Sequence, residues 1–238
     1  MNNKMRLALL GLLLLIAGFD IGLLVGPSLA PRGDGAMTMS AAAGIAALPA
    51  KGPILLEGVP DVHQSTTYSC GAAALQAVMS YYGVDKRERA LMESLKTNED
   101  AGTSPGNIIR VAMENGFGAR IREGLTIEDL AAAVRDGIPV IADIQAWTDA
   151  AKTGFHWTGD WEDGHYVVVI GLDDRNVYVE DPSLLGTRGV IPRAEFLERW
   201  RDYEGAPPHD ASDRSYVRMG IYITGKAAAP RPEFTKVD

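Results

Sequence analysis

The sequence has almost no cysteine, because Cys70 is the single cysteine among 238 residues. One thiol cannot form an internal disulfide bond, so a fold that depends on a disulfide framework is excluded. A zinc or iron–sulfur site built from several cysteines is excluded for the same reason. The lone thiol therefore needs an explanation of its own.

Basic residues are fewer than acidic ones, since 23 Lys and Arg face 31 Asp and Glu and give a formal net charge of −8. A nucleic-acid-binding domain normally carries a basic surface stripe, so we expect no nucleic-acid partner. The apolar share of 46% is that of an ordinary globular chain, which excludes a disordered or collagen-like protein. We also expect no metal ion and no cofactor.

Residues 1–30 differ in composition from the rest of the chain. Lys4 and Arg6 precede the apolar run 7–18, and a basic start followed by an apolar stretch is typical of a secretory signal peptide. Asp20 interrupts the stretch, whereas a membrane-spanning helix needs about 20 apolar residues with few charges. We therefore expect a signal peptide or a signal-anchor, and a periplasmic or otherwise extracytoplasmic protein that contacts a membrane only through an uncleaved N-terminal segment.

The remaining chain divides by composition into three parts. Residues 31–53 are rich in Gly, Ala, Pro and Ser and lack the periodicity of a helix or strand, which is typical of a flexible linker. Residues 54–225 have the length of one domain and contain no internal repeat. Residues 226–238 include two prolines and are predicted to be a flexible tail.

Four helices are predicted in the first half of this domain, over residues 70–82, 86–95, 105–115 and 126–135. Gly83 and Gly116 are stop signals, Pro105 suits a first helical turn, and Thr126 with Asp129 resembles a capping box. The apolar face of the third helix is predicted to contain Ile108, Ile109, Ala112 and Met113.

The pattern then changes to short β-branched runs, over residues 138–144, 166–172, 176–180 and 217–223. Asp173-Asp174-Arg175 between the second and third runs is typical of a hairpin turn, and residues 193–203 are predicted to be helical. Helices followed by hairpin strands predict an α+β domain in which N-terminal helices pack on an antiparallel sheet.

Cys70 is predicted to lie at the start of the first helix. The helix dipole and the free backbone N–H groups at that position favour a thiolate, so this thiol is a candidate nucleophile. The alternative is a small buried apolar side chain. An exported protein that keeps an unpaired thiol favours the first interpretation, because oxidation threatens such a thiol.

A histidine and a carboxylate are predicted to lie side by side further along the chain. His165 opens the strand 166–172, and Asp181 follows its hairpin partner 176–180. Because the start of one hairpin strand lies beside the end of the other, Asp181 is expected next to His165. His165 is thus a candidate general base, and Asp181 a candidate for holding its tautomer and orientation.

Gln64 lies six residues before Cys70. Its side-chain amide, together with the Cys70 backbone N–H, is a candidate oxyanion hole. A glutamine in a polar loop is more often simply solvated when it occurs alone. Neighbouring His63 is expected to line the cleft, and His209 is given no role.

Three motifs carry a resemblance to a known family: Gln64 with Tyr68-Ser69-Cys70-Gly71-Ala72-Ala73, Gly164-His165-Tyr166-Val167-Val168-Val169, and Glu180-Asp181-Pro182. In this order they resemble the peptidase C39 domain, which has a papain-like cysteine protease fold. The resemblance extends from about residue 59 to residue 203. It implies Cys70 as nucleophile, His165 as general base, Asp181 as orienting residue and Gln64 as oxyanion donor.

The family is best known from bacteriocin-exporting transporters, where the domain removes double-glycine leaders on the cytoplasmic side. In this sequence no transporter domain or nucleotide-binding loop follows, and an export signal precedes the domain. The resemblance therefore implies an exported cysteine peptidase that acts on a secreted or precursor polypeptide, with a secretion apparatus as a further expected partner. Two alternatives stay open, namely a catalytically silent leader-binding or scaffolding module and a papain-like cell-wall amidase or endopeptidase.

The segment 145–163 is rich in aromatic residues and directly precedes His165. Trp147, Phe155, Trp157 and Trp161 are expected either to form a wall or lid of the substrate groove or to pack against the sheet. The acidic residues at its end, Asp160, Glu162 and Asp163, are expected to form a solvated loop rather than a metal site.

Overall fold

The computed structural model describes residues 52–147 and 156–226. The predicted signal segment 1–30, nearly all of the predicted linker and the tail beyond residue 226 lie outside the described residues, so these boundaries stay predictions. Within the described ranges, no helix combines the length and the apolar character that crossing a bilayer requires.

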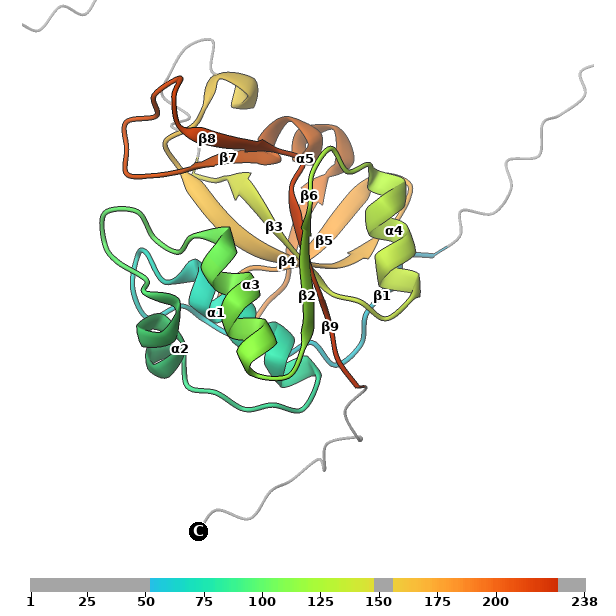
Figure 1. The fold of residues 1–238 in the computed structure, drawn as a ribbon. Helices are drawn as coiled ribbons and strands as arrows, with labels where there is room; N and C mark the ends of the chain where they lie inside the picture. The colour runs from blue at the N-terminus through green and yellow to red at the C-terminus, as the bar shows by residue number, and fades with distance from the viewer. Residues whose placement is uncertain (1–51, 148–155, 227–238) are drawn as a thin grey trace, which may run out of the picture. The chain divides into compact units, whose positions relative to one another are not determined.

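The helices occupy nearly the predicted positions (Figure 1). They are α1 (Cys70–Tyr81), α2 (Glu88–Leu95), α3 (Pro105–Glu114), α4 (Ile127–Arg135) and α5 (Arg193–Arg199), with a short 3-10 turn at Trp157–Gly159. The predicted capping box of α4 is present, because the Asp129 backbone N–H donates to the Thr126 hydroxyl and the Asp129 carboxylate accepts from the Thr126 backbone N–H. The local signal at Thr126 therefore marks where α4 begins.

The strands form an antiparallel sheet of seven strands and a separate antiparallel pair. They are β1 (Ile54–Leu55), β2 (Gly118–Arg122), β3 (Val140–Gln145), β4 (Gly164–Leu172), β5 (Asn176–Glu180), β6 (Gly189–Pro192), β7 (Arg201–Glu204), β8 (Arg214–Val217) and β9 (Gly220–Thr224). The large sheet has the order β2-β9-β3-β4-β5-β6, β1 pairs with the end of β4, and β7 pairs with β8. The predicted α+β class with an antiparallel sheet is confirmed.

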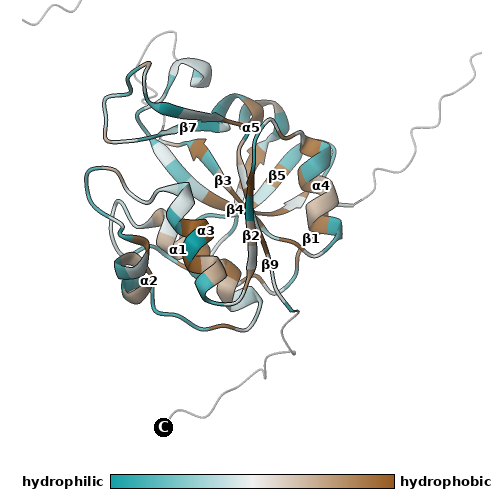
Figure 2. Cartoon of the chain, in the orientation of Figure 1, coloured by the Kyte–Doolittle hydropathy of each residue, from teal (hydrophilic) through white to brown (hydrophobic). Residues whose placement is uncertain are grey.

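Helices cover both faces of the large sheet, and each face has its own apolar core (Figure 2). On one face α1, α2 and α3 pack against side chains such as Val168 and Ile221. On the other face α4 and α5 pack against side chains such as Val167 and Val140. Because successive strand residues point to opposite faces, the continuous apolar run of β4 can supply both cores.

The central hairpin β4–β5 is irregular at one point. Val168 pairs with Glu180 and Val169 with Val179, but Gly171 then pairs with Tyr178, so a bulge lies between Val169 and Gly171. The predicted turn at residues 173–175 closes this hairpin, and the Asp173 carboxylate accepts hydrogen bonds from the backbone N–H groups of the next residues. The open end of the hairpin carries the start of β4 and the end of β5.

Two predictions about the helices are wrong in detail. The helix expected over 193–203 ends at Arg199, because residues 201–204 pair as a strand with 214–217. Trp200 at the junction is fully buried and donates its indole N–H to the Met219 carbonyl. Met113, expected on the buried face of α3, is 58% exposed, and Val111 lies inside instead. In both cases tertiary contacts decide where local pattern is ambiguous.

Phe196 of α5 provides a test of the second core. It is fully buried and packs against Trp200, whereas the adjacent Leu197 is 38% exposed. Phe196→Ala is expected to lower the free energy of unfolding by about 3–5 kcal/mol through lost burial and a cavity. Leu197→Ala is the matched control and should cost about 1 kcal/mol or less. Urea denaturation measures both, and similar losses for the two variants would contradict the described packing.

The loop of residues 59–64 is tied to the end of β5 by a buried ion pair. The Glu180 carboxylate is fully buried, pairs with Arg188, and accepts the Val62 backbone N–H at 2.7 Å. Arg188 also donates to the Val59 and Pro60 carbonyls. A second tie is the Gln64 backbone N–H, which donates to the Pro182 carbonyl at 2.9 Å. The loop therefore cannot move independently of β5.

Removing one partner of this ion pair tests its contribution to stability. Arg188→Met leaves the Glu180 charge buried and unpaired, and because Arg188 is itself partly exposed we expect a loss of about 2–3 kcal/mol in the free energy of unfolding. Adding Glu180→Gln should restore much of that loss, since no charge then remains buried. Arg89→Met breaks the exposed Arg89–Glu93 pair and is the control, with an expected change of about 0.5 kcal/mol. Equal losses in the free energy of unfolding for Arg188→Met and Arg89→Met would contradict the stabilising role of the Arg188–Glu180 ion pair.

Candidate active site

Cys70 is the first residue of α1 and lies half-buried where this helix meets the sheet. The position depends on the following glycine, because a Cβ atom at Gly71 would lie 2.8 Å from Thr103 Cβ and 3.1 Å from the Tyr166 ring. A helix that begins so close to β4 therefore requires glycine after the cysteine. As the first residue of the helix, Cys70 has a backbone N–H with no intrahelical acceptor.

The turn before Cys70 is held by its own side chains. The Ser69 hydroxyl accepts the Thr66 backbone N–H at 3.1 Å and donates to the Thr66 carbonyl. The Gln64 side-chain amide donates to the same carbonyl at 2.7 Å. Gln64 is buried and lies on the turn that leads into α1, and the backbone bond to Pro182 fixes it beside Asp181 as well.

His165 and Asp181 are in direct contact at the open end of the β4–β5 hairpin. His165 Nε2 and Asp181 Oδ1 are 2.6 Å apart, and the His165 side chain is 1% exposed. The same Asp181 oxygen accepts from the backbone N–H and the hydroxyl of Ser183, each at 2.8 Å. Ser183 thus holds the carboxylate in its position independently of the contact with the imidazole.

The pKa values of this pair move in the directions that an ion pair requires. Burial alone would lower the pKa of His165, but the hydrogen bond to Asp181 and the contact with the Cys70 thiol raise it to about 9. Burial opposes ionisation of Asp181, yet the His165 contact and the bonds from Ser183 bring its pKa below the usual value. At neutral pH the imidazole therefore carries a positive charge between two groups that stabilise it.

The structure places two of the sequence-predicted residues, Cys70 and Asp181, beside the imidazole of a third, His165. Asp181 binds His165 Nε2, and the Cys70 thiol interacts with the same ring. Gln64 lies on the turn that precedes Cys70, and one of its two amide N–H donors donates to the Thr66 carbonyl. In the described part of the chain, neither Gln64 Oε1 nor His165 Nδ1 has a hydrogen-bond partner. His63 is exposed and does not line the cavity beside Cys70, and its expected place in the cleft stays a prediction.

Aromatic side chains of segment 145–163 lie against this site. The Trp147 ring is 4.8 Å from the His165 ring and is 53% exposed, and Trp161 stacks on His209 at 4.7 Å. Trp157 lies under the Arg199 guanidinium at 4.5 Å. Phe155 lies outside the described residues. Trp147 and Trp161 line the cavity, so of the two interpretations the wall of a groove fits these two rings.

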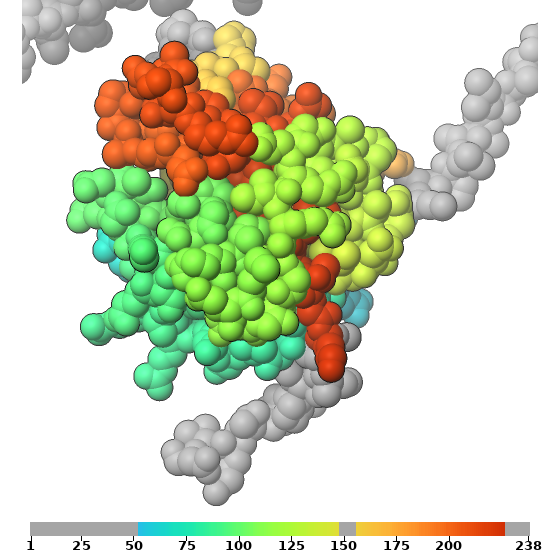
Figure 3. Space-filling model, viewed as in Figure 1, coloured from blue at the N-terminus to red at the C-terminus, as the bar shows by residue number. Residues whose placement is uncertain are grey.

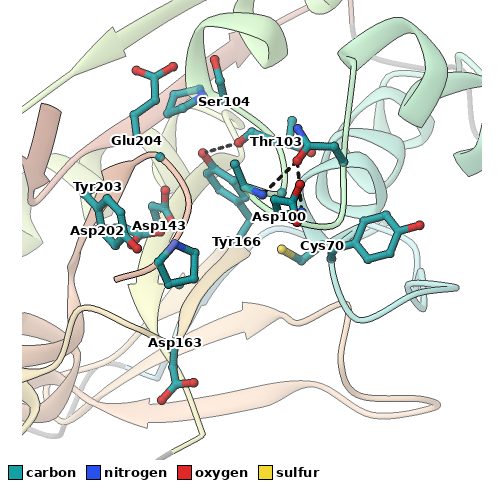
Figure 4. A pocket seen from close by; sticks show the side chains of 18 of the residues that line it. Cys70, Asp100, Thr103, Ser104, Asp143, Asp163, Tyr166, Asp202, Tyr203 and Glu204 are labelled. Atoms are coloured by element: carbon teal, nitrogen blue, oxygen red, sulfur yellow. Dashed lines mark hydrogen bonds between the residues drawn. The ribbon is translucent and has the colours of Figure 1, made fainter. Parts of the chain in front are cut away.

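A cavity of about 420 Å³ opens beside Cys70. One side of the cavity is formed by residues 96–107 and the other by residues 202–207. In Figure 3 the first segment is green and the second is orange, and the two meet on the face shown. Figure 4 shows Tyr166 between Cys70 and the carboxyl groups of Asp143 and Asp202. The Tyr166 hydroxyl donates to the Thr103 carbonyl at 3.1 Å.

Sequence reasoning missed both of these carboxyl groups. A signal for Asp143 was present, because it is the one charged residue in the apolar run 138–144. No comparable signal marks Asp202, since its place follows from the β7–β8 pairing. Glu162 and Asp163, expected in a solvated loop, also line the cavity. The described residues contain no group of three or more His, Cys, Asp or Glu placed to hold a metal ion.

The sequence matches the Peptidase_C39 like family over residues 56–207. An uncharacterized protein of Methanothermobacter marburgensis is 34% identical over 123 residues, which cover 52% of this chain and 71% of that protein. The transport/processing ATP-binding protein ComA of Streptococcus pneumoniae is 31% identical over 142 residues, which cover 59% of this chain but 17% of ComA.

Solved structures agree on the fold. The peptidase domain of Streptococcus ComA matches with a TM-score of 0.52 and 21% identity, over 71% of this chain and all of that domain. A putative C39-like peptidase from Bacillus anthracis matches with a TM-score of 0.54 and 19% identity, over 74% of this chain and all of that one. The family match covers more than half of the sequence and places the Cys70, His165 and Asp181 segments within its range: this chain belongs to the Peptidase_C39 like family.

Proposed function

We propose that this chain is an exported cysteine peptidase that cleaves a peptide bond in a secreted or precursor polypeptide by acyl transfer. The observation that carries the proposal is the buried His165 imidazole, which lies 2.6 Å from the Asp181 carboxylate and whose pKa is raised by both Asp181 and the nearby Cys70 thiol. A nucleophile, a base and a carboxylate that orients the base are the groups that this chemistry needs. Membership of a peptidase family supports it.

The reaction follows from where the proton lies. In the proposed reaction the imidazole of His165 holds the proton of the Cys70 thiol, and the resulting thiolate attacks the carbonyl carbon of the peptide bond. The carbonyl oxygen becomes an oxyanion, and His165 then gives its proton to the leaving amine as the C–N bond breaks. The remaining thioester is attacked by a water molecule whose proton His165 takes, which releases the acid and restores the Cys70 thiolate beside the protonated His165.

Gln64 is proposed to stabilise the oxyanion together with the Cys70 backbone N–H. Support comes from its buried position on the turn that precedes Cys70 and from its attachment to Pro182 beside Asp181. One amide N–H already donates to Thr66, which holds the amide plane, and the second donor is proposed to point at the reacting carbonyl. A donor that is oriented in advance needs no reorganisation energy when the oxyanion forms.

The substrate class and the location are proposed on separate grounds. The S. pneumoniae relative is named a transport/processing protein, which supports processing of a polypeptide linked to secretion. The basic and apolar start of the chain supports a place outside the cytoplasm, reached through a signal peptide or an N-terminal anchor. On this account the polypeptide and a secretion apparatus are the partners.

Replacing the thiol tests the chemistry. Cys70→Ala is expected to abolish cleavage of a peptide library while leaving the protein folded, because a half-buried side chain is exchanged for one of similar size. Mass spectrometry of the library detects cleavage, and Asp174→Asn on the exposed hairpin turn is the control that should retain it. Continued cleavage by Cys70→Ala would refute the nucleophile. A wild-type protein that cleaves nothing would favour the leader-binding module instead.

The pH dependence tests the ion pair. Because the protonated imidazole is stabilised, wild-type activity should fall as the pH rises through about 9, where His165 loses its proton. Asp181→Asn removes a negative charge in direct contact, so this alkaline midpoint should move down by about one unit or more. Rate measurements of kcat/KM from pH 6 to about pH 10 give both midpoints. An identical alkaline midpoint in the two proteins would contradict the role of Asp181.

A further inference from the structure

The cavity beside Cys70 has a buried carboxyl group on its wall. Asp143 lies in the middle of β3, is 3% exposed, and lines the cavity. Its Oδ1 atom has no hydrogen-bond partner in the described part of the chain. A buried, unsatisfied carboxyl oxygen is costly, so its retention in a cavity that adjoins the thiol calls for a ligand.

Asp202 of β7 lies next to Asp143 and lines the same cavity. Its carboxylate accepts the Gln145 side-chain amide at 3.1 Å and lies so close to Gly164 that a Cβ atom at that position would overlap it. Gly164 is the residue directly before His165. The acid pair is therefore fixed against the strand that carries the proposed general base, and it is not a feature of a remote surface.

Both carboxyl groups are harder to ionise than an exposed one. Burial raises the pKa of Asp143 well above its usual range, and the charge of Asp202 adds to the rise. Burial also raises the pKa of Asp202 to about 6, against the bonds from Asp143, the Tyr203 backbone and Gln145 and the charge of His209. A cation placed beside the pair would therefore favour its ionised form.

The surroundings add negative charge and little positive charge. Five further acidic residues line the cavity, namely Glu99, Asp100, Glu162, Asp163 and Glu204. Lys96 is the one lysine or arginine among the lining residues. Within the described ranges, no salt bridge reaches Asp143 or Asp202. Among the described residues, the lining of the cavity therefore carries mostly negative charge, which is complementary to a cation.

We propose that this cavity binds the side chain of a lysine or arginine of the polypeptide substrate, close to the scissile bond, with its cation between Asp143 and Asp202. The inference rests on the proposed peptidase function and specifies its substrate. A side chain fits the 420 Å³ of the cavity, and its N–H donors would satisfy Asp143 Oδ1. Tyr166 lies between the acid pair and Cys70 (Figure 4). The basic side chain is therefore bound next to the scissile peptide bond, and the carbonyl group of that bond stays free to react with Cys70.

The test compares arginine with citrulline, which has the same shape and no charge. Hexapeptides of alanine and glycine carry one arginine at each position in turn, and a second set carries citrulline. At one position or more, kcat/KM is expected to be about tenfold or more higher with arginine. Asp143→Asn and Asp202→Asn should each bring the ratio close to one. Asp174→Asn removes an exposed charge outside the cavity and should leave the ratio unchanged.

Binding to Cys70→Ala protein separates this inference from the proposed function. Its dissociation constants for the same peptides should show the same preference for arginine, whether or not the wild-type protein cleaves them. Selective binding without cleavage would refute the peptidase and leave the basic-residue site standing. Equal affinity and equal cleavage for arginine and citrulline would overturn the inference. A preference that survives in both Asp143→Asn and Asp202→Asn would also overturn it, because other acidic residues would then be responsible.

Discussion

The hydrogen bond between His165 and Asp181 is the contact on which the rest of the site depends. It joins the start of β4 to the segment that follows β5, and it exists because these strands pair as an antiparallel hairpin. The imidazole is almost completely buried, so without the carboxylate its protonated form would be disfavoured. Asp181 in turn is held by Ser183, which makes the pair rigid.

The other groups are brought to this contact by packing from separate directions. Cys70 arrives on α1, which packs on one face of the sheet, and Gly71 allows the helix to begin against Tyr166. Gln64 arrives on a loop that the buried Glu180 and its partner Arg188 tie to β5. Two chain segments that are far apart in the sequence, residues 59–70 and the β4–β5 hairpin, thus meet because the loop and the start of α1 are both anchored to this hairpin.

Much of this arrangement could be predicted from the sequence, because its signals are local. Caps and stop signals mark the helices, as at Thr126 and Gly83, and the hairpin turn at 173–175 predicts that Asp181 lies near His165. What could not be predicted depends on long-range pairing. Strand β2 alternates weakly between exposed and half-buried residues, and β7 continues a helical pattern that only its pairing with β8 interrupts. Asp202 has its place for that reason alone.

The acid pair shows how stability and function oppose each other in this fold. Asp143 is buried and Asp202 is half-buried beside it, and no salt bridge in the described part of the chain reaches either carboxyl group, which weakens the folded state. The same groups give the cavity a charge that a basic side chain can neutralise. If a substrate provides this cation, part of its binding energy comes from relieving a cost that the free protein carries.

The most direct measurement of the central claim is the titration of His165 by NMR, with labelled histidine and with His165→Gln to assign the signal. We expect His165 to stay protonated up to about pH 9 in the wild-type protein, because both the thiol and the carboxylate stabilise its charge. In Cys70→Ala the midpoint should fall, while the hydrogen bond to Asp181 remains. A midpoint near the ordinary value of 6.5, or one that is the same with and without the thiol, would contradict it.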